Sequence, residues 1–216
     1  TDVTDSTDDI DEIVSTTTTA AGGIDTIESG DGDDVILGGR FGDAINGRDG
    51  DNVIIGDSGR LLAATIDDVF LLSGHTFTVG LIETIEDTDG GADVIETLTG
   101  RDIVLGGHDA DTISVSDLAN LSDAGENAFN DHNIVIGDNG RIDYQDETDA
   151  TDSTDDIDEI VSTTTTAAGG IDTIESGDGD DVILGGRFGD TIDGREGDNV
   201  IIGDSGRILA ATIDSI

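Results

Sequence analysis

The sequence contains no cysteine, methionine, tryptophan, proline or lysine, and its eight basic residues are all arginine. Without cysteine the chain forms no disulfide, so its redox compartment cannot be inferred from cysteine usage. With so few basic residues it lacks the positive surface that nucleic acid requires, and anionic membrane surfaces would repel it. No apolar run approaches the roughly 20 residues that a membrane-spanning helix needs. We therefore expect neither nucleic-acid binding nor membrane insertion.

Acidic residues dominate what is present. The 216 residues include 51 Asp and Glu, which gives a formal net charge of −43. A high net charge and few aromatic residues, here 3%, are typical of disordered chains. The hydrophobic fraction of 34% and the regular spacing of Ile, Val and Leu argue against disorder. We therefore predict a chain that repels itself when free of metal and folds when cations neutralise it.

The chain repeats itself on a long scale. Residues 4–67 recur as residues 151–214, at an offset of 147 residues, with four differences in 64 aligned pairs. The segment between them is a divergent copy, and we interpret the A–B–A order as an excerpt from a longer tandem array. We predict three units: copy A at 1–67 (roll core 20–60), copy B at 68–147 (roll core 88–142, insertion 115–132) and copy A′ at 148–216 (roll core 167–207).

A shorter period of nine residues lies inside each copy. Copy A reads AAGGIDTIE, SGDGDDVIL, GGRFGDAIN and GRDGDNVII over residues 20–55, with Asp or Asn at the sixth place and Ile at the eighth. Copy B keeps this frame through residues 97–114 and recovers it at Asn133. The apolar or β-branched triplets predict short strands, and the glycine-rich segments between them predict tight turns.

These nonapeptides resemble the RTX repeat G-G-x-G-x-D-x-U-x, a calcium-binding parallel β-helix repeat. The match is imperfect, because Phe41 and Arg48 occupy usual glycine places and Asn52 replaces Asp. The resemblance implies an all-β fold, with parallel β-roll or β-helix solenoid blocks in tandem, joined by short strand-rich segments. It also implies calcium as the cofactor and a likeness to the tandem repeats of large secreted bacterial adhesins.

Stacking of the repeats brings sixth-place residues together. If two nonapeptides form one coil with the Ile ladder facing inward, turns on the same edge lie 18 residues apart, so that Asp25 approaches Asp43. Calcium takes six to eight oxygen ligands from carboxylates and carbonyls, which stacked glycine turns can supply jointly. The predicted metal ligands are Asp25, Asp34, Asp43, Asn52, Asp93, Asp102, Asp111, Asn133, Asp172, Asp181, Asp190 and Asn199. Other turn acids are predicted to shape the turns, with direct ligation as the alternative: Asp31, Asp33, Asp49 and Asp51.

Three segments lie outside the regular frame. Residues 1–19 are acidic and then Thr-rich, and we predict irregular strands that cap or continue the roll, with a flexible linker as the alternative. Residues 61–86 alternate apolar and polar positions in places, which predicts strands that close one roll and join the next. The insertion at 117–130 is predicted to be a loop or a short helix with its own ions.

Signals for catalysis are weak. The sequence GDSG at residues 56–59 and 203–206 resembles the nucleophile motif of chymotrypsin-like proteases, but the corresponding place in copy B, residues 137–140, reads GDNG. A serine nucleophile needs a positioned base, and all three histidines belong to copy B, at His75, His108 and His132. The histidines are interpreted as isolated surface residues rather than as a transition-metal site. We expect no enzymatic activity.

The function that these patterns favour is structural. We expect a calcium-binding repeat module of a large extracellular, secreted or cell-surface protein, such as an adhesin stalk or matrix element, that folds on binding calcium. Its expected partners are calcium ions, neighbouring repeats of the same chain and, in one alternative, other copies of itself. That alternative is a self-assembling calcium-dependent filament or surface layer, and a further one is an accessory RTX domain of a secreted toxin or hydrolase. Any secretion signal is expected to lie outside this segment.

Overall fold

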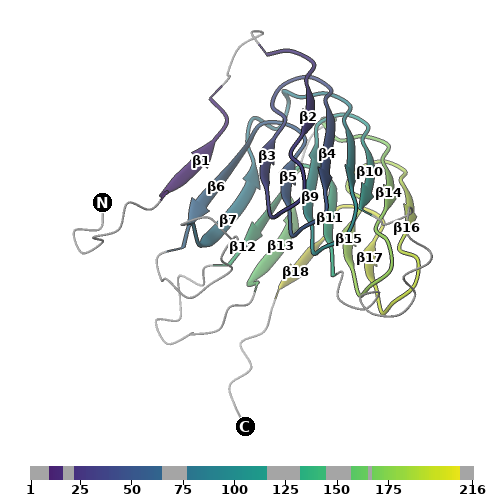
Figure 1. Cartoon of the computed structure of the whole chain (residues 1–216). Coiled ribbons are helices and arrows are strands. Elements are labelled where there is room, and N and C mark those ends of the chain that lie inside the picture. The colour runs from purple at the N-terminus through teal and green to yellow at the C-terminus, as the bar shows by residue number, and fades with distance from the viewer. Residues whose placement is uncertain are drawn as a thin grey trace.

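The computed structural model shows an all-β molecule. It describes residues 10–16, 22–64, 77–115, 132–144, 157–164 and 167–209, and these form strands, turns and bends without any helix. Within this part of the chain, no helix is long and apolar enough to cross a membrane. The strands form three six-stranded sheets that lie as layers (Figure 1).

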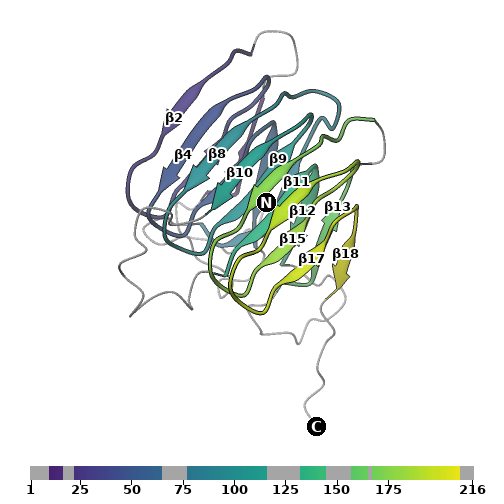
Figure 2. The same ribbon diagram turned by 90° about the vertical axis from the view of Figure 1, so that its right-hand side faces the viewer.

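Two of the sheets are parallel and are built from the nonapeptides. We call the first the outer sheet; it contains β2 (Thr26–Glu28), β4 (Ala44–Arg48), β8 (Val94–Thr97), β10 (Thr112–Val115), β14 (Thr173–Glu175) and β16 (Thr191–Asp193). We call the second the central sheet; it contains β3 (Val35–Leu37), β5 (Val53–Ile55), β9 (Ile103–Gly107), β11 (Ile134–Asp138), β15 (Val182–Leu184) and β17 (Val200–Ile202). Figure 2 shows the outer sheet towards the viewer, with β2, β4, β8 and β10 side by side in that order.

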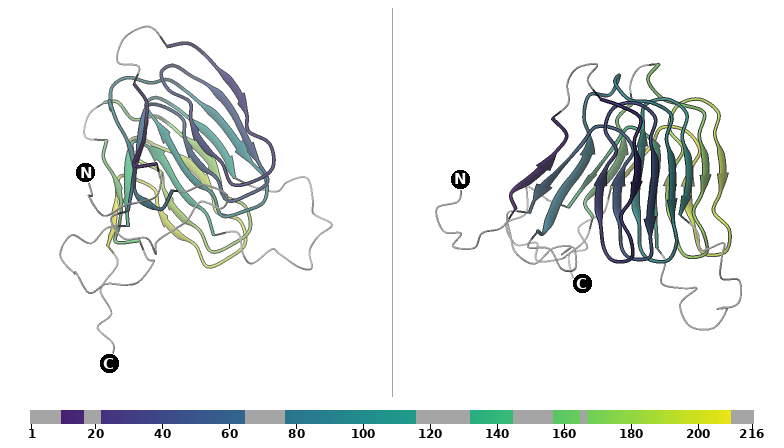
Figure 3. Two further views of the ribbon diagram at one scale, coloured as in Figure 1. Left: turned by 60° about the vertical axis from the view of Figure 1, so that its left-hand side comes forward. Right: turned by 45° about the horizontal axis from the view of Figure 1, so that its top comes forward.

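Successive coils pair in the register that the nine-residue frame predicts. Ile27 pairs with Ile45 and Ile36 with Ile54, each partner lying 18 residues further along the chain. The stack continues across the boundaries between copies, because β4 pairs with β8 and β10 pairs with β14 (Figure 3). The predicted parallel β-roll is therefore confirmed, and the three copies contribute to the same two sheets. The residue boundaries proposed between the copies stay a prediction.

The eighth-place residues fill the interior of the roll. All but Ile201 of the last coil, which is 46% exposed, point between the outer and central sheets and form one apolar column with an added Val115: Ile27, Ile36, Ile45, Ile54, Ile95, Val104, Ile113, Val135, Ile174, Ile183 and Ile192. The spacing between the two sheets is thus set by a ladder of β-branched side chains, which suit the pleated surface of short strands. The predicted inward Ile ladder is confirmed.

A third layer covers the other face of the central sheet. This antiparallel sheet runs in the order β1 (Glu12–Val14), β6 (Gly59–Ala63), β7 (Val79–Thr84), β12 (Gly140–Asp143), β13 (Glu159–Ser162) and β18 (Arg207–Leu209). A second apolar core lies between the two sheets and includes Val53, Ile55, Leu61, Ile82 and Ile142. The central sheet is therefore buried on both faces, and its strands read as continuous apolar triplets such as Val35-Ile36-Leu37. Outer-sheet strands have one solvated face and read Thr-Ile-Glu.

The antiparallel sheet is made by the segments that leave and rejoin the roll. After β5 the chain passes through β6 and β7 before it returns to β8, and after β11 it passes through β12 and β13 before it returns to β14. Residues 61–86 therefore contain the predicted joining strands. For residues 1–19, β1 pairs with β6 and extends this sheet. The remainder of that segment, apart from residues around β1, and the insertion at 117–130 lie outside the described residues.

At two places where the repeat usually has glycine, other residues adopt the left-handed backbone conformation that glycine favours. Phe41 has φ of 74° and Arg48 has φ of 56°, and their equivalents Phe188 and Arg195 have φ of 78° and 45°. This left-handed region costs a residue with a Cβ about 1–2 kcal/mol relative to its preferred conformations. The turn geometry of the repeat is thus kept where the glycine is not, although the register between β4 and β8 shifts between Asn46 and Arg48.

Candidate functional site

The twelve predicted ligands lie in two ladders along the two edges of the roll. The first, the all-Asp ladder, precedes the outer-sheet strands and contains Asp25, Asp43, Asp93, Asp111, Asp172 and Asp190. The second, the mixed ladder, precedes the central-sheet strands and contains Asp34, Asn52, Asp102, Asn133, Asp181 and Asn199. Each ladder takes one residue from each coil, so that residues far apart in sequence become neighbours. The predicted approach of Asp25 to Asp43 is seen as a hydrogen bond of 2.7 Å. The role of the twelve residues as ligands stays a prediction.

One side-chain oxygen of each ladder residue except Asp25 and Asp34 accepts a hydrogen bond from the backbone of the preceding coil. In the all-Asp ladder the backbone N–H of Asp93 donates to Oδ1 of Asp111 at 2.8 Å, and that of Asp111 donates to Oδ1 of Asp172 at 2.8 Å. In the mixed ladder the N–H of Asn52 donates to Oδ1 of Asp102 at 2.9 Å. These bonds satisfy backbone donors at the turns, which the sheet ladders do not reach.

The second carboxylate oxygen distinguishes the all-Asp ladder. Five of its six members have an Oδ2 that is buried and has no hydrogen-bond partner: Asp43, Asp93, Asp111, Asp172 and Asp190. Of these, Asp93, Asp111 and Asp172 are at most 1% exposed. A buried carboxylate oxygen without a partner is costly, and five in one column indicate a missing partner of positive charge.

A glycine carbonyl lies beside each orphaned oxygen. A Cβ placed on Gly106 would lie within 3 Å of both Oδ2 of Asp111 and the carbonyl oxygen of Gly137. The same convergence of a carboxylate oxygen and the next coil's carbonyl oxygen recurs at four more glycines: Gly38, Gly56, Gly137 and Gly185. Glycine is needed there because the position faces two oxygens at close range, and each such place is a partial cradle for a cation.

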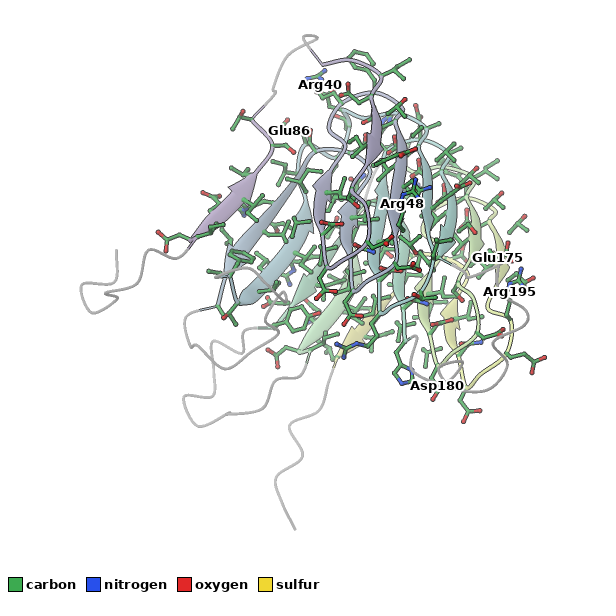
Figure 4. The ribbon with its side chains drawn as sticks, in the orientation of Figure 1. Arg40, Arg48, Glu86, Glu175, Asp180 and Arg195 are labelled. Atoms are coloured by element: carbon green, nitrogen blue, oxygen red, sulfur yellow. The ribbon has the colours of Figure 1, made fainter. Side chains whose placement is uncertain are left out.

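No basic side chain neutralises this ladder. Among the described residues, the ion pairs of arginine involve other acids, as with Arg195 and Glu175 on the outer sheet (Figure 4). Burial raises the pKa of Asp93 to about 8, with repulsion from Asp43 adding to the rise. Burial also raises the pKa of Asp172 to about 7 and that of Asp111 well above its usual range. The fold thus holds a column of like charges that favour protonation or a cation.

Calcium fits this donor set. It is a hard cation that accepts carboxylate and backbone carbonyl oxygens at 2.3–2.6 Å in flexible geometry. In the described part of the chain, no three His, Cys, Asp or Glu side chains gather into a metal site on their own. The residues that would hold the ion are the orphaned carboxylates and the glycines that face them.

Two buried aspartates were missed by the sequence interpretation. Asp57 and Asp138 lie where the chain leaves the roll after β5 and β11, and they are 2% and 0% exposed. Asp57 accepts hydrogen bonds from the backbone N–H of Gly91, where the chain returns, and from that of His108 in the next coil. Asp138 accepts equivalent bonds from Gly170 and Arg187. Each clamps the departing strand to two turns of the roll.

The clamps were recognisable only in part. The recurrence of Gly-Asp at the end of each copy, in GDSG and GDNG, is the signal that marks them. Burial raises the pKa of Asp57 to about 9, although its two backbone hydrogen bonds oppose the rise and the nearby carboxylates of Asp93 and Asp43 add to it. Asp57 therefore adds a further buried acid to the side of the roll that carries the all-Asp ladder.

The exposed turn acids make a minor ladder of their own. The N–H of Asp51 donates to Oδ1 of Asp33 at 2.8 Å, and the N–H of Arg101 donates to Oδ1 of Asp51 at 2.9 Å. Arg101 also forms an ion pair with Asp51 at 2.6 Å. These contacts agree with the turn-shaping role predicted for this group, and direct ligation stays a prediction.

The histidines that the structure describes lie in separate turns. The N–H of His108 bonds to Asp57, and Nδ1 of His132 accepts a hydrogen bond of 3.3 Å from the N–H of Asp180. His75 lies outside the described residues. The two described histidines therefore serve turn contacts on the two edges of the roll, and neither belongs to a cluster that could hold a metal.

Comparison with known proteins gives one family. The model of a family described as the RTX calcium-binding nonapeptide repeat (4 copies) matches residues 19–45, 28–60, 87–117, 166–192 and 175–207, which together span more than half of the chain. Searches of curated proteins and of solved structures gave no match.

A methyl group inside the cradle should impair metal binding. We expect Gly106→Ala to weaken calcium binding at least tenfold, because its Cβ would collide with the backbone carbonyl oxygen of Gly137 in the next coil and with Oδ2 of Asp111, and so would push apart the two oxygens that the ion needs. Gly203 holds the same repeat position in the last coil, where a Cβ would meet no atom within 4 Å, so Gly203→Ala is the matched control. Calorimetric titration with calcium checks this. Equal affinities in the two variants would contradict the cradle.

The pH dependence of the metal-free chain should be inverted relative to an ordinary acidic protein. The buried aspartates have folded pKa values raised above 3.8, to about 7, 8 and 9 for Asp172, Asp93 and Asp57. A raised folded pKa means that stability is fully present below the unfolded pKa and is lost as pH rises through the folded pKa. In chelator, β-sheet content should therefore fall between about pH 5 and pH 9. Circular dichroism measures this, and saturating calcium should restore the β-sheet signal at pH 8. A metal-free chain that gains β-structure with rising pH would contradict the interpretation.

Proposed function

Because the chain belongs to the RTX calcium-binding nonapeptide repeat family, we propose that it serves as a structural module of a large extracellular or cell-surface protein and folds when calcium fills the all-Asp ladder. Calcium binding through these repeats makes the ion a structural rather than a catalytic cofactor. The observation that carries the proposal is the column of five buried, unpartnered Oδ2 atoms that face glycine carbonyls.

Charge explains why calcium can act as the folding switch. The metal-free chain carries a formal charge of −43, and folding would bury part of that charge in one column. Binding to the folded state alone stabilises that state by mass action. Extracellular calcium modules bind with dissociation constants of roughly 10⁻⁴–10⁻³ M, so folding would be coupled to a calcium-rich environment. RTX repeats are typical of secreted proteins, which agrees with this location.

A stalk or matrix element is the role that the stack supports best. Backbone hydrogen bonds run from coil to coil without interruption at the copy boundaries, as between Val94 and Asp43 and between Thr173 and Asp111. The antiparallel sheet also crosses these boundaries, since β6 pairs with β7 and β12 pairs with β13. Near-identical copies could therefore be added in series without a flexible joint, which suits a rod that sets a distance.

We propose no catalytic role for the GDSG segments. The carboxylate of Asp57 is engaged by two backbone donors as a clamp, which gives this motif a structural task in the repeat. An accessory domain of a toxin or hydrolase would show the same roll, and that alternative depends on what the parent protein contains elsewhere.

The proposed switch has a direct spectroscopic test. On titration of the chelated chain with calcium at pH 7.5, far-UV circular dichroism should change cooperatively from coil to β-structure. Magnesium at the same concentrations should leave the coil unchanged, because it demands octahedral geometry and dehydrates reluctantly. A chain that is β-rich in chelator at this pH, or that responds equally to both ions, would remove calcium as the switch.

A further inference from the structure

We propose that the two edges of the roll are closed by different chemistry: calcium fills the all-Asp ladder, whereas the mixed ladder from Asn52 to Asn199 is closed by its own amide and hydroxyl groups and takes no calcium. The inference rests on the proposed function for the first edge. It departs from the expectation that sixth-place residues of both edges act as equivalent ligands.

Carboxylates of the mixed ladder already have partners. Oδ2 of Asp102 accepts a hydrogen bond of 2.5 Å from the hydroxyl of Thr97, and Oδ2 of Asp181 accepts one of 2.6 Å from the hydroxyl of Ser176. Their Oδ1 atoms accept backbone N–H groups, as in the other ladder. Both oxygens are therefore satisfied, in contrast to the orphaned Oδ2 atoms on the opposite edge.

The side-chain amides of asparagine donate hydrogen bonds to turn carbonyl oxygens on this edge and to one carboxylate oxygen. The Nδ2 group of Asn52 donates to the carbonyl of Gly50 at 2.9 Å and to Oδ1 of Asp102 at 3.0 Å. Nδ2 of Asn133 donates to the carbonyl of Ser176 at 2.8 Å, and Nδ2 of Asn199 donates to that of Gly194 at 2.6 Å. An NH₂ group directed at a turn carbonyl takes the place that a cation would need and presents positive hydrogen atoms to it.

Alternation of Asp and Asn also reduces the repulsion between neighbouring carboxylates on this edge. Each mixed-ladder carboxylate from Asp102 to Asp181 has neutral Asn residues in the coils before and after it. In the all-Asp ladder every neighbour is another carboxylate, as for Asp111 between Asp93 and Asp172. Repulsion between like charges falls with distance, so spacing the acids two coils apart weakens the need for a counter-ion.

The residue five places earlier helps to distinguish the two edges. On the calcium edge the residue five places earlier is Gly in three coils, at Gly38/Asp43, Gly106/Asp111 and Gly185/Asp190, and Ala in two, at Ala20/Asp25 and Ala167/Asp172, and neither Gly nor Ala can donate a side-chain hydrogen bond. Thr88/Asp93 is the exception on this edge, because Oδ2 of Asp93 has no partner although Thr88 carries a hydroxyl. On the mixed edge the earlier residue carries a hydroxyl where the ladder residue is Asp, and it is Gly for two of the three Asn residues: Ser29/Asp34, Gly47/Asn52, Thr97/Asp102, Ser176/Asp181 and Gly194/Asn199, with Ala128 before Asn133. Each of these mixed-edge combinations thus supplies one side-chain donor, and the three Gly/Asp combinations supply none.

Asp34 marks the limit of the closed edge. Its Oδ2 is buried without a partner, because the hydroxyl of Ser29 donates instead to the carbonyl of Gly47 at 3.2 Å. This residue lies in the first described coil, and the inference therefore begins at Asn52.

Exchange of single residues between the two edge types tests the inference. Asn52→Asp creates an Asp that follows Gly47, and the full chain should then bind one more calcium ion than the wild type. Asp111→Asn creates the closed combination on the calcium edge, and this variant should bind one ion fewer. Asp102→Asn is the control, since it removes a buried carboxylate that already has its donors, and the calcium count should not change. Native mass spectrometry in calcium acetate gives the counts, and circular dichroism in calcium verifies folding.

The outcomes separate this inference from the proposed function. A wild-type chain that binds no calcium would refute the proposed function itself. A chain that binds calcium but loses an ion with Asp102→Asn, or gains none with Asn52→Asp, would overturn the closed edge while leaving calcium-dependent folding intact. Because Asn52→Asp adds a site, a failure of Asp111→Asn to fold still leaves the inference open to refutation.

Discussion

The structure depends on how buried carboxylates in a column are neutralised. Stacking the coils at one residue per turn forces Asp43, Asp93, Asp111 and Asp172 into contact along one edge, each with an oxygen that no protein donor reaches. The cost of burying such groups is several kcal/mol each unless they are paired or protonated. We therefore propose that folding near neutral pH depends on a partner from outside the chain, and calcium suits the oxygen donors that the turns present.

The apolar parts of the molecule favour the folded roll, and we propose that the state of the carboxylate column decides whether the chain folds. The Ile ladder fills the roll, and the antiparallel sheet seals the other face of the central sheet. Asp57 and Asp138 fasten each excursion to the roll through backbone donors. Hydrophobic burial favours the roll and carboxylate repulsion opposes it, and on the proposed function a small number of ions would shift the balance between these two large opposing contributions. A second edge that closes itself would reduce the number of ions that this shift requires.

The sequence allowed the roll and the positions of both ladders to be predicted, because the nine-residue frame determines which residues stack. It did not allow the third layer to be predicted, although the contrast between Val-Ile-Leu and Thr-Ile-Glu triplets contains that information. To infer the third layer from this contrast, one must know that alternate triplets lie in the same sheet, so that one sheet is covered on both faces and the other is not. The clamps at Asp57 and Asp138 were missed because their partners, such as Gly91 and Gly170, are brought close only by the return of the chain. The difference between the edges was also hidden, since Asn and Asp occupy the same place in the repeat and differ only in the hydrogen bonds that the folded turns offer.

The most direct test of the account is a crystal structure of the chain grown in calcium, with anomalous difference maps that locate the ions. The account predicts peaks along the all-Asp ladder, each beside an Oδ2 atom from Asp43 to Asp190 and a glycine carbonyl of the adjoining coil. A calcium-grown crystal with the roll intact and no peak beside these oxygens would contradict it.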